Sequence, residues 1–133
     1  MSVGSARKED AHVGDEMPDG TVYAGISPDT GKAMYATPAD APLTYTFNRA
    51  QKYALMLDAN GYKDWRVPTR VELNVLFENR AAIGGFDGYR TPADGWYWSS
   101  SQSGPKAYGQ RFTDGFRHYD NKGFVSSLRC VRG

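Results

Sequence analysis

The stretch GWYWSSSQ, residues 95–102, places two of the three tryptophans of the chain beside a tyrosine and three serines. In an extended strand, Trp96 and Trp98 share one face and Tyr97 lies on the other. Because a small domain without a disulfide needs its largest apolar groups inside, we expect Trp98 in the core and Trp96 in the core or at its rim. Tyr97 is then the better candidate for contact with a ligand.

Strand-like segments surround this stretch at both ends of the chain. After the glycine-rich loop at residues 84–95, apolar and polar residues alternate to the end of the chain, with turns at TDG and DNKG. Two short runs, residues 21–26 and 32–37, flank the turn SPDTG and predict a hairpin. The expected fold class is α+β: an N-terminal β-hairpin, two helices, and a twisted antiparallel β-meander closed by residues 124–132.

Two helices are predicted between the hairpin and the glycine-rich loop. Residues 47–59 carry apolar side chains at helical spacing, with Thr46 as the expected N-cap and an Asn-Gly pair as a left-handed ending. The stretch PTRVELNVLF, residues 68–77, places Thr69 three positions before Glu72. That spacing is typical of a capping box and predicts the start of the second helix.

The segment DWRVPT, residues 64–69, leads into the second helix and contains an arginine beside a tryptophan. The Arg66 guanidinium is suited to binding a carboxylate or a phosphate. The Pro-Thr cap favours a structural interpretation instead, in which Arg66 packs on or near Trp65 and pairs with Asp64.

The length of 133 residues suits a single domain, expected over residues 18–133 after a flexible arm at residues 1–17. An apolar content of 40% indicates a globular chain rather than a disordered one. The sequence has neither an apolar run that could cross a bilayer nor the hydrophobic stretch of a secretory signal. We therefore expect no membrane insertion, and a location in the cytoplasm or export by a route without such a signal.

Charge is unevenly distributed along the chain. Residues 1–95 hold ten Lys/Arg and thirteen Asp/Glu, a net charge of −3, whereas residues 96–133 hold six Lys/Arg and two Asp/Glu, a net charge of +4. A basic C-terminal third favours anionic partners through long-range attraction. The alternative is that these arginines pair with acidic residues of the first half, and the pattern favours it slightly.

Patterns for catalysis and metal binding are sparse. The two histidines, His12 and His118, are far apart in the sequence and lack metal-ligand spacing, so we expect neither a metal nor another cofactor. Cys130 follows Arg129, which can lower the pKa of a thiol and make it a nucleophile. Burial in the last strand is the favoured interpretation, because unpaired cysteines are usually buried.

The stretch FTDGFRHYDNKG, residues 112–123, mixes aromatic side chains with cations at tight turns, which is typical of binding surfaces. Alternation places Phe116 and His118 on one face and Arg117 and Tyr119 on the other. An ordinary exposed hairpin explains the composition equally well. Together with the loop at residues 84–95 it supplies the candidate ligand contacts: Tyr89, Arg90, Tyr97, Arg111, Arg117, His118, Tyr119 and Lys122.

Four motifs in order, DWRVPTRVELNVL, GWYWSSS, QRFTDG and SLRCVR, resemble the Lcl C-terminal domain family, which is named for a collagen-like bacterial adhesin. The resemblance spans residues 18 to 132. More distantly, the chain looks like the C-type-lectin-like fold that formylglycine-generating enzymes and variable receptor-binding domains use. This resemblance implies a binding module for glycans, often anionic ones, or for proteins, with no catalytic residues carried over. The calcium-sugar motifs of true C-type lectins are absent.

The favoured hypothesis is a non-catalytic recognition domain that binds a glycan, anionic glycans included, or a protein through residues 84–95 and 112–123. The alternative is an oligomeric structural or receptor-binding component of a phage or secreted particle, in which the same surface joins proteins. A third hypothesis is an oxidase-like enzyme that uses Cys130. We expect no nucleic acid partner in any of these.

Overall fold

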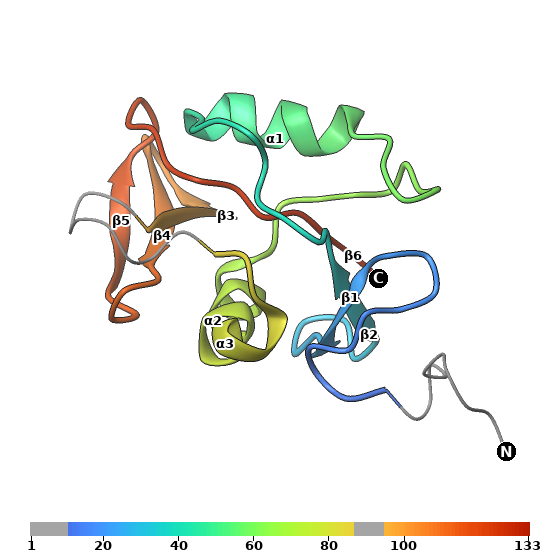
Figure 1. Ribbon diagram of the computed structural model, residues 1–133. Helices are drawn as coiled ribbons and strands as arrows, with labels where there is room; N and C mark the ends of the chain where they lie inside the picture. The colour runs from blue at the N-terminus through green and yellow to red at the C-terminus, as the bar shows by residue number, and fades with distance from the viewer. Residues whose placement is uncertain (1–10, 87–94) are drawn as a thin grey trace, which may run out of the picture.

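The computed structural model describes residues 11–86 and 95–133. Within them, two three-stranded antiparallel sheets lie on either side of the second and third helices of the chain. The first helix crosses above the space between the sheets (Figure 1). This arrangement confirms the α+β prediction. The elements in chain order are β1 (Val22–Ile26), β2 (Ala33–Ala36), α1 (Phe47–Met56), α2 (Arg70–Glu78), α3 (Arg80–Ile83), β3 (Trp96–Ser103), β4 (Lys106–Arg111), β5 (Arg117–Asn121) and β6 (Val131–Arg132).

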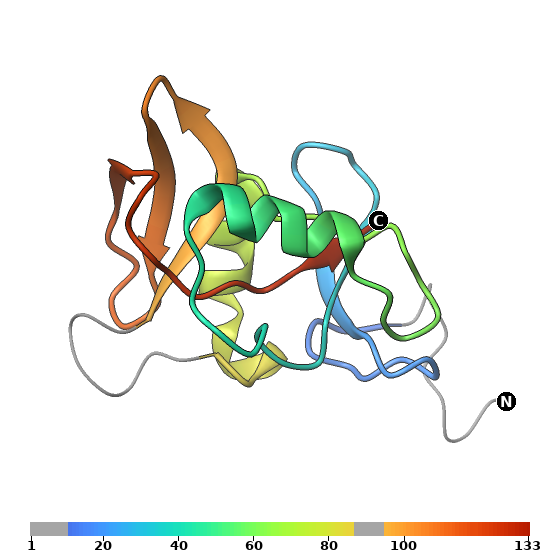
Figure 2. The same cartoon turned by 90° about the horizontal axis from the view of Figure 1, so that it is seen from above.

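The last strand joins the N-terminal sheet, which the sequence pattern did not predict. The sheet orders are β1-β2-β6 and β3-β4-β5, so residues 124–132 do not close the meander. Instead, residues 124–130 run alongside α1 from one sheet to the other (Figures 1 and 2). Four consecutive side chains, Leu128 to Val131, are buried. A segment that is covered on all sides does not alternate between buried and exposed residues, so the strand pattern did not apply to it.

Both predicted helices begin after the expected N-cap residue, but the first one ends earlier than predicted. Thr69 accepts a hydrogen bond from the Glu72 backbone, and the Glu72 side chain accepts one from the Thr69 backbone, which confirms the capping box. α1 ends at Met56 rather than at residue 59, since Leu57 turns to an extended conformation. The left-handed residue Asn60, with a φ of 54°, lies in a later turn. α3 is a short helix that the sequence analysis did not predict.

At Tyr97 and Trp98 both faces of β3 are buried, so this part of the strand separates two apolar clusters. Tyr97 belongs to the first cluster, and the next residue, Trp98, belongs to the second, where its ring meets Phe47 of α1 at 5.7 Å. The prediction that Trp98 is core is confirmed, and of the two places predicted for Trp96, core or rim, the structure shows the rim. The first cluster further contains Val22, Ala24, Met34, Ala36, Leu73, Leu76, Ile83, Phe86, Phe112 and Val131; the second contains Tyr45, Phe47, Ala50, Ala54, Trp65, Val67, Ala107, Leu128 and Cys130.

Residues 11–17 are part of the domain rather than of a flexible arm. Val13 packs against the first cluster, Met17 is buried, and the Gly14 N–H donates to the Tyr23 carbonyl at 2.9 Å. This segment therefore differs from the predicted arm, because its backbone pairs with the edge strand β1 at Gly14, Asp15 and Glu16. Residues 1–10 lie outside the described residues.

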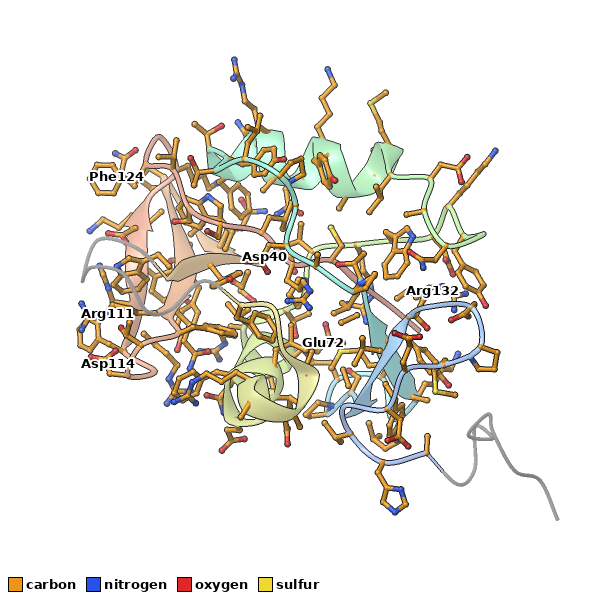
Figure 3. All side chains as sticks on the ribbon, in the orientation of Figure 1. Asp40, Glu72, Arg111, Asp114, Phe124 and Arg132 are labelled. Atoms are coloured by element: carbon orange, nitrogen blue, oxygen red, sulfur yellow. The ribbon has the colours of Figure 1, made fainter. Side chains whose placement is uncertain are left out.

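Two buried charges connect segments that are distant in sequence. Arg129 donates from Nε to the Thr37 carbonyl and from Nη2 to the Gly84 carbonyl, both at 2.8 Å, and pairs with Asp40 at 3.1 Å. Its guanidinium also lies 4.2 Å from the centre of the Phe86 ring. Asp40 lies between the two sheets in Figure 3. This arginine therefore joins the last segment of the chain to the connections that follow β2 and α3.

Glu72 is the second buried charge, and its partner corrects a prediction. Arg66 donates to Glu72 from Nη1 at 2.5 Å and from Nη2 at 2.8 Å, so Arg66 does not pair with Asp64. Ser27 Oγ donates a third hydrogen bond at 2.5 Å, which links β1 to α2. Burial by itself raises the pKa of Glu72, but these hydrogen bonds outweigh it and lower the pKa to about 2.

Candidate functional site

The β4–β5 hairpin presents different side chains on its two faces. Tyr108 is opposite Tyr119, and Gln110 is opposite Arg117. The turn between the strands lies against α2: Gly115 has a φ of 84°, and a Cβ added there would lie 2.5 Å from the Phe77 ring. Glycine adopts a positive φ at little cost and, without a Cβ, leaves room for the Phe77 ring. The turn can therefore pack directly against α2, which fixes the orientation of the hairpin relative to the helix.

The first face, here called the aromatic face, consists of Trp96, Arg111, Phe116 and His118. The Trp96 ring lies 5.0 Å from the His118 ring and 6.1 Å from the Phe116 ring, and the Arg111 guanidinium is 5.5 Å from both Trp96 and Phe116. The prediction that Phe116 and His118 share a face is confirmed by their ring separation of 5.4 Å.

The charges of the aromatic face are compensated within it. Arg111 donates to both carboxylate oxygens of Asp114, at 2.6 and 3.0 Å, and His118 contacts Asp120 at 2.9 Å. The hydrogen bond from Arg111 lowers the pKa of Asp114 to about 2. Arg111 and Asp114 lie together at the outer edge of the sheet (Figure 3). Phe116 is 53% exposed. A ligand on this face would therefore meet aromatic surface rather than an unpaired charge.

The second face, here called the tyrosine face, consists of Arg70, Tyr108, Arg117 and Tyr119. The two tyrosine rings meet edge to face at 5.0 Å, and the Arg70 guanidinium lies 5.6 Å from the Tyr108 ring centre. Arg70, Arg117 and Tyr119 are exposed. Among the described residues, neither arginine forms an ion pair with a carboxylate. The tyrosine face thus combines aromatic surface with positive charge that those residues do not neutralise.

Tyr97 lies on the same side of the sheet as Arg117, through its register with Gln110, but it is part of the core and not of the exposed tyrosine face. Its ring is fully buried, 4.4 Å from the Phe112 ring and 5.6 Å from the Phe86 ring, and its hydroxyl donates to Asp40. The prediction that Tyr97 contacts a ligand is therefore wrong. Alternation correctly placed it opposite the tryptophans, but α2 and α3 cover that side of β3 as well.

The remaining predicted contacts are dispersed. Lys122 follows β5, where its Nζ donates to Gln102 at 2.5 Å and lies 5.1 Å from the centre of the Phe47 ring. It is thus on the side of the sheet that α1 covers. Tyr89 and Arg90 lie outside the described residues. The structure therefore divides the predicted set: Arg111 and His118 are on the aromatic face, and Arg117 and Tyr119 are on the tyrosine face.

Two of the six cations of the C-terminal third pair with acidic residues of the first half. Arg129 pairs with Asp40, and Arg132 pairs with Asp64 through two hydrogen bonds at 2.7 and 3.0 Å. The alternative interpretation of the charge pattern is confirmed for these two arginines. Arg117 is exposed, and unlike the other arginines of this third it forms no ion pair with a carboxylate of the described residues.

Sequence reasoning missed two members of the tyrosine face, Arg70 and Tyr108. Tyr108 had only a partial signal, because counting residues outward from the TDG turn places it opposite Asp120, one position away from its actual partner Tyr119. Arg70 had none, since it is the first residue of α2 and reaches Tyr108 only through the packing of that helix beside the sheet.

Cys130 shows the opposite of what a nucleophile requires. Burial raises the pKa of its thiol to about 12, in spite of the neighbouring charge of Arg129. The thiol therefore stays protonated at neutral pH. Within residues 11–86 and 95–133, no group of three or more His, Cys, Asp or Glu side chains is placed to hold a metal ion. In the same residues, no helix has the length and apolar character needed to span a bilayer.

Comparison with known proteins places the chain in a family. A family model of the Lcl C-terminal domain matches residues 26–132, a range that holds α1, α2, both faces of the β4–β5 hairpin and the last strand. A search of curated proteins found no match. Since the matched range covers most of the chain and contains the capping box, the β3 strand and the closing Arg-Cys-Val-Arg segment, this protein belongs to the Lcl C-terminal domain family.

Proposed function

We propose that this domain is a non-catalytic recognition module that binds an anionic glycan on its tyrosine face. The observation that carries the proposal is the pair of exposed arginines, Arg70 and Arg117, beside the tyrosine pair Tyr108 and Tyr119. Aromatic rings of this kind stack on sugar rings, and guanidinium groups form two parallel hydrogen bonds with a sulfate or a carboxylate.

The rigidity of the hairpin supports this proposal. The backbone of Tyr108 and Tyr119 is fixed by the β4–β5 ladder, and Gly115 anchors the turn on α2. A preformed surface loses little conformational entropy when the ligand binds. The aromatic face, with Arg111 and His118 already paired, would contribute apolar contacts at the edge of the site. Contacts from Lys122, Tyr89 and Arg90, and the C-type-lectin-like fold itself, stay predictions.

The first test compares dextran sulfate with unsulfated dextran, which share a backbone and differ in charge. Arg70→Ala with Arg117→Ala is expected to weaken binding of dextran sulfate by at least about 100-fold, because it removes two or more charge-assisted hydrogen bonds that each contribute about 1.5–3 kcal/mol. Calorimetry at low and high salt measures the loss, and the salt dependence should decrease in the double variant.

The matched control removes two exposed cations that lie outside the tyrosine face, with Lys32→Ala and Lys63→Ala. Lys32 lies in the turn of the other sheet, between β1 and β2, so the net charge changes equally while the tyrosine face is intact. If both double variants lost the same affinity for dextran sulfate, the net charge of the protein would explain the effect, and the proposed site would be contradicted. Tight binding of dextran that does not depend on sulfate would contradict the anionic ligand.

A second candidate function is an oligomeric structural or receptor-binding component. Phe124 and Val125 follow β5 and are each 59% exposed, and Phe124 lies at the outer edge of the sheet (Figure 3). Adjacent exposed apolar side chains are typical of protein interfaces. This function predicts that sedimentation finds an assembly of several chains and that Phe124→Ser with Val125→Ser reduces it to one chain. A single chain before the substitution would contradict it.

A further inference from the structure

A groove of about 430 Å³ lies along α1, away from the two faces described above. Its walls are the connection before the helix, with Leu43 and Tyr45, and the helix side that carries Tyr53 and Met56. A volume in this range accommodates a small organic molecule. We call this feature the α1 groove.

The floor of the α1 groove is attached to the core. The Tyr45 and Tyr53 rings lie 5.2 Å apart, the Tyr45 carbonyl accepts a hydrogen bond from Trp98 Nε1 at 2.7 Å, and its hydroxyl accepts one from the Leu43 N–H at 3.3 Å. The groove therefore exists before a ligand arrives. A preformed site needs little reorganisation on binding.

The rim of the α1 groove is unusually apolar for a surface. Leu43 is 69% exposed and Met56 is 71% exposed, and both line the groove. Exposed apolar side chains at a concave site indicate a partner that covers them. Methionine adapts its shape to different apolar groups. The apolar part of a ligand would remove these two side chains from water.

Positive charge lines the same groove. Arg49 and Lys52 are one helical turn apart on the side of α1 that carries Tyr53 and Met56. Neither forms an ion pair with a carboxylate within residues 11–86 and 95–133. Asp58 also lines the groove, but Lys63 lies 3.9 Å from its carboxylate. The net charge at the groove is therefore positive.

From this combination we infer that the α1 groove binds a small free amphiphile, a molecule with an apolar body and one anionic head group. The apolar body lies on Leu43, Tyr53 and Met56, and the head group lies between Arg49 and Lys52. This site is separate from the tyrosine face, so each of the two proposals can fail while the other holds.

The experiment titrates the full chain with octanoate, 1-octanol and acetate, and follows backbone amide signals by nuclear magnetic resonance. Octanoate carries both features of the ligand, octanol only the chain and acetate only the charge. We expect octanoate to shift signals of residues 43–58 and to bind at least about tenfold more tightly than either of the others. Equal affinity for octanol, or shifts confined to other segments, would overturn the inference.

Three variants separate the contributions. Met56→Ser is expected to weaken octanoate and octanol alike by about threefold to tenfold, because both bury their chains there. Arg49→Gln with Lys52→Gln is expected to weaken octanoate about tenfold and to leave octanol unchanged. Leu55→Ser is the matched control, since Leu55 is 78% exposed on the same helix but does not line the groove.

Two results of these variants would contradict the site. One is a loss with Leu55→Ser as large as that with Met56→Ser, which would indicate nonspecific binding to exposed apolar residues. The other is a dimer in sedimentation that Met56→Ser dissociates, since a second copy of the chain would then occupy the groove. All of the substituted side chains are exposed, so the variants are expected to fold.

Discussion

Arg129→Ala is expected to lower the free energy of unfolding by about 3–5 kcal/mol, which is the usual effect of breaking a buried ion pair. The side chain is fully buried, and its removal takes away the ion pair with Asp40 at 3.1 Å and the hydrogen bonds that Arg129 donates to the Thr37 and Gly84 carbonyls. Urea denaturation at neutral pH measures the change. Arg129→Lys keeps the charge but not the planar fork, so most of the loss should persist.

Arg132→Ala is the control for this prediction. Arg132 is close in sequence and also pairs with an aspartate through two hydrogen bonds, but Asp64 is 60% exposed. Ion pairs at the surface contribute about 0–1 kcal/mol, so a loss of about 1 kcal/mol is expected. Similar losses in the two variants would mean that burial does not determine the importance of Arg129.

Glu72→Ala is the second substitution with a large expected effect, again about 3–5 kcal/mol. The Glu72 side chain is fully buried, whereas Arg66 is one-third exposed, and the substitution removes the acceptor of both Arg66 and Ser27. It also removes half of the capping box, because the Thr69 N–H loses its acceptor at 2.9 Å. Thermal and urea denaturation should agree on the loss. Glu78→Ala, an exposed position of the same helix, is expected to change stability by less than about 0.5 kcal/mol.

The pH dependence of stability provides an independent check on Glu72. Its pKa in the folded protein is about 2, below the ordinary value of 4.5. A carboxyl group whose pKa is lowered by folding stabilises the protein above the unfolded pKa, and this contribution disappears as the pH falls through the folded pKa. We therefore expect the free energy of unfolding to decrease between about pH 4.5 and pH 2, and Glu72→Gln to show a smaller decrease. Equal slopes in wild type and variant would contradict the assignment.

The candidate site was only partly predictable. The hairpin at residues 112–123, the sharing of one face by Phe116 and His118, and the opposite direction of Arg117 and Tyr119 follow from strand alternation, and the β4–β5 register confirms them. Tyr97 was misplaced, because alternation tells which side of a strand a residue occupies and not what covers that side. Arg70 could not be found, since it reaches Tyr108 across 38 positions of sequence.

The sequence alone determined the α+β class, the capped start of α2 and the turns of the β1–β2 and β4–β5 hairpins. These features depend on residues within a few positions of one another: Thr69 and Glu72 are three apart, and the SPDTG and TDG turns contain the glycines that adopt a positive φ. Local backbone geometry selects the residue types, and for that reason a short stretch suffices to predict them.

Only the tertiary structure decided the pairing of β6 with β2, the burial of both faces in part of β3, and the partners of Arg129 and Glu72. Each of these depends on which elements pack together over tens of residues, and periodicity within one element does not specify its neighbour. A buried charge is stable only where several distant segments supply its partners at once. A short stretch of sequence does not show which distant segments will supply these partners, so they become known only from the folded structure.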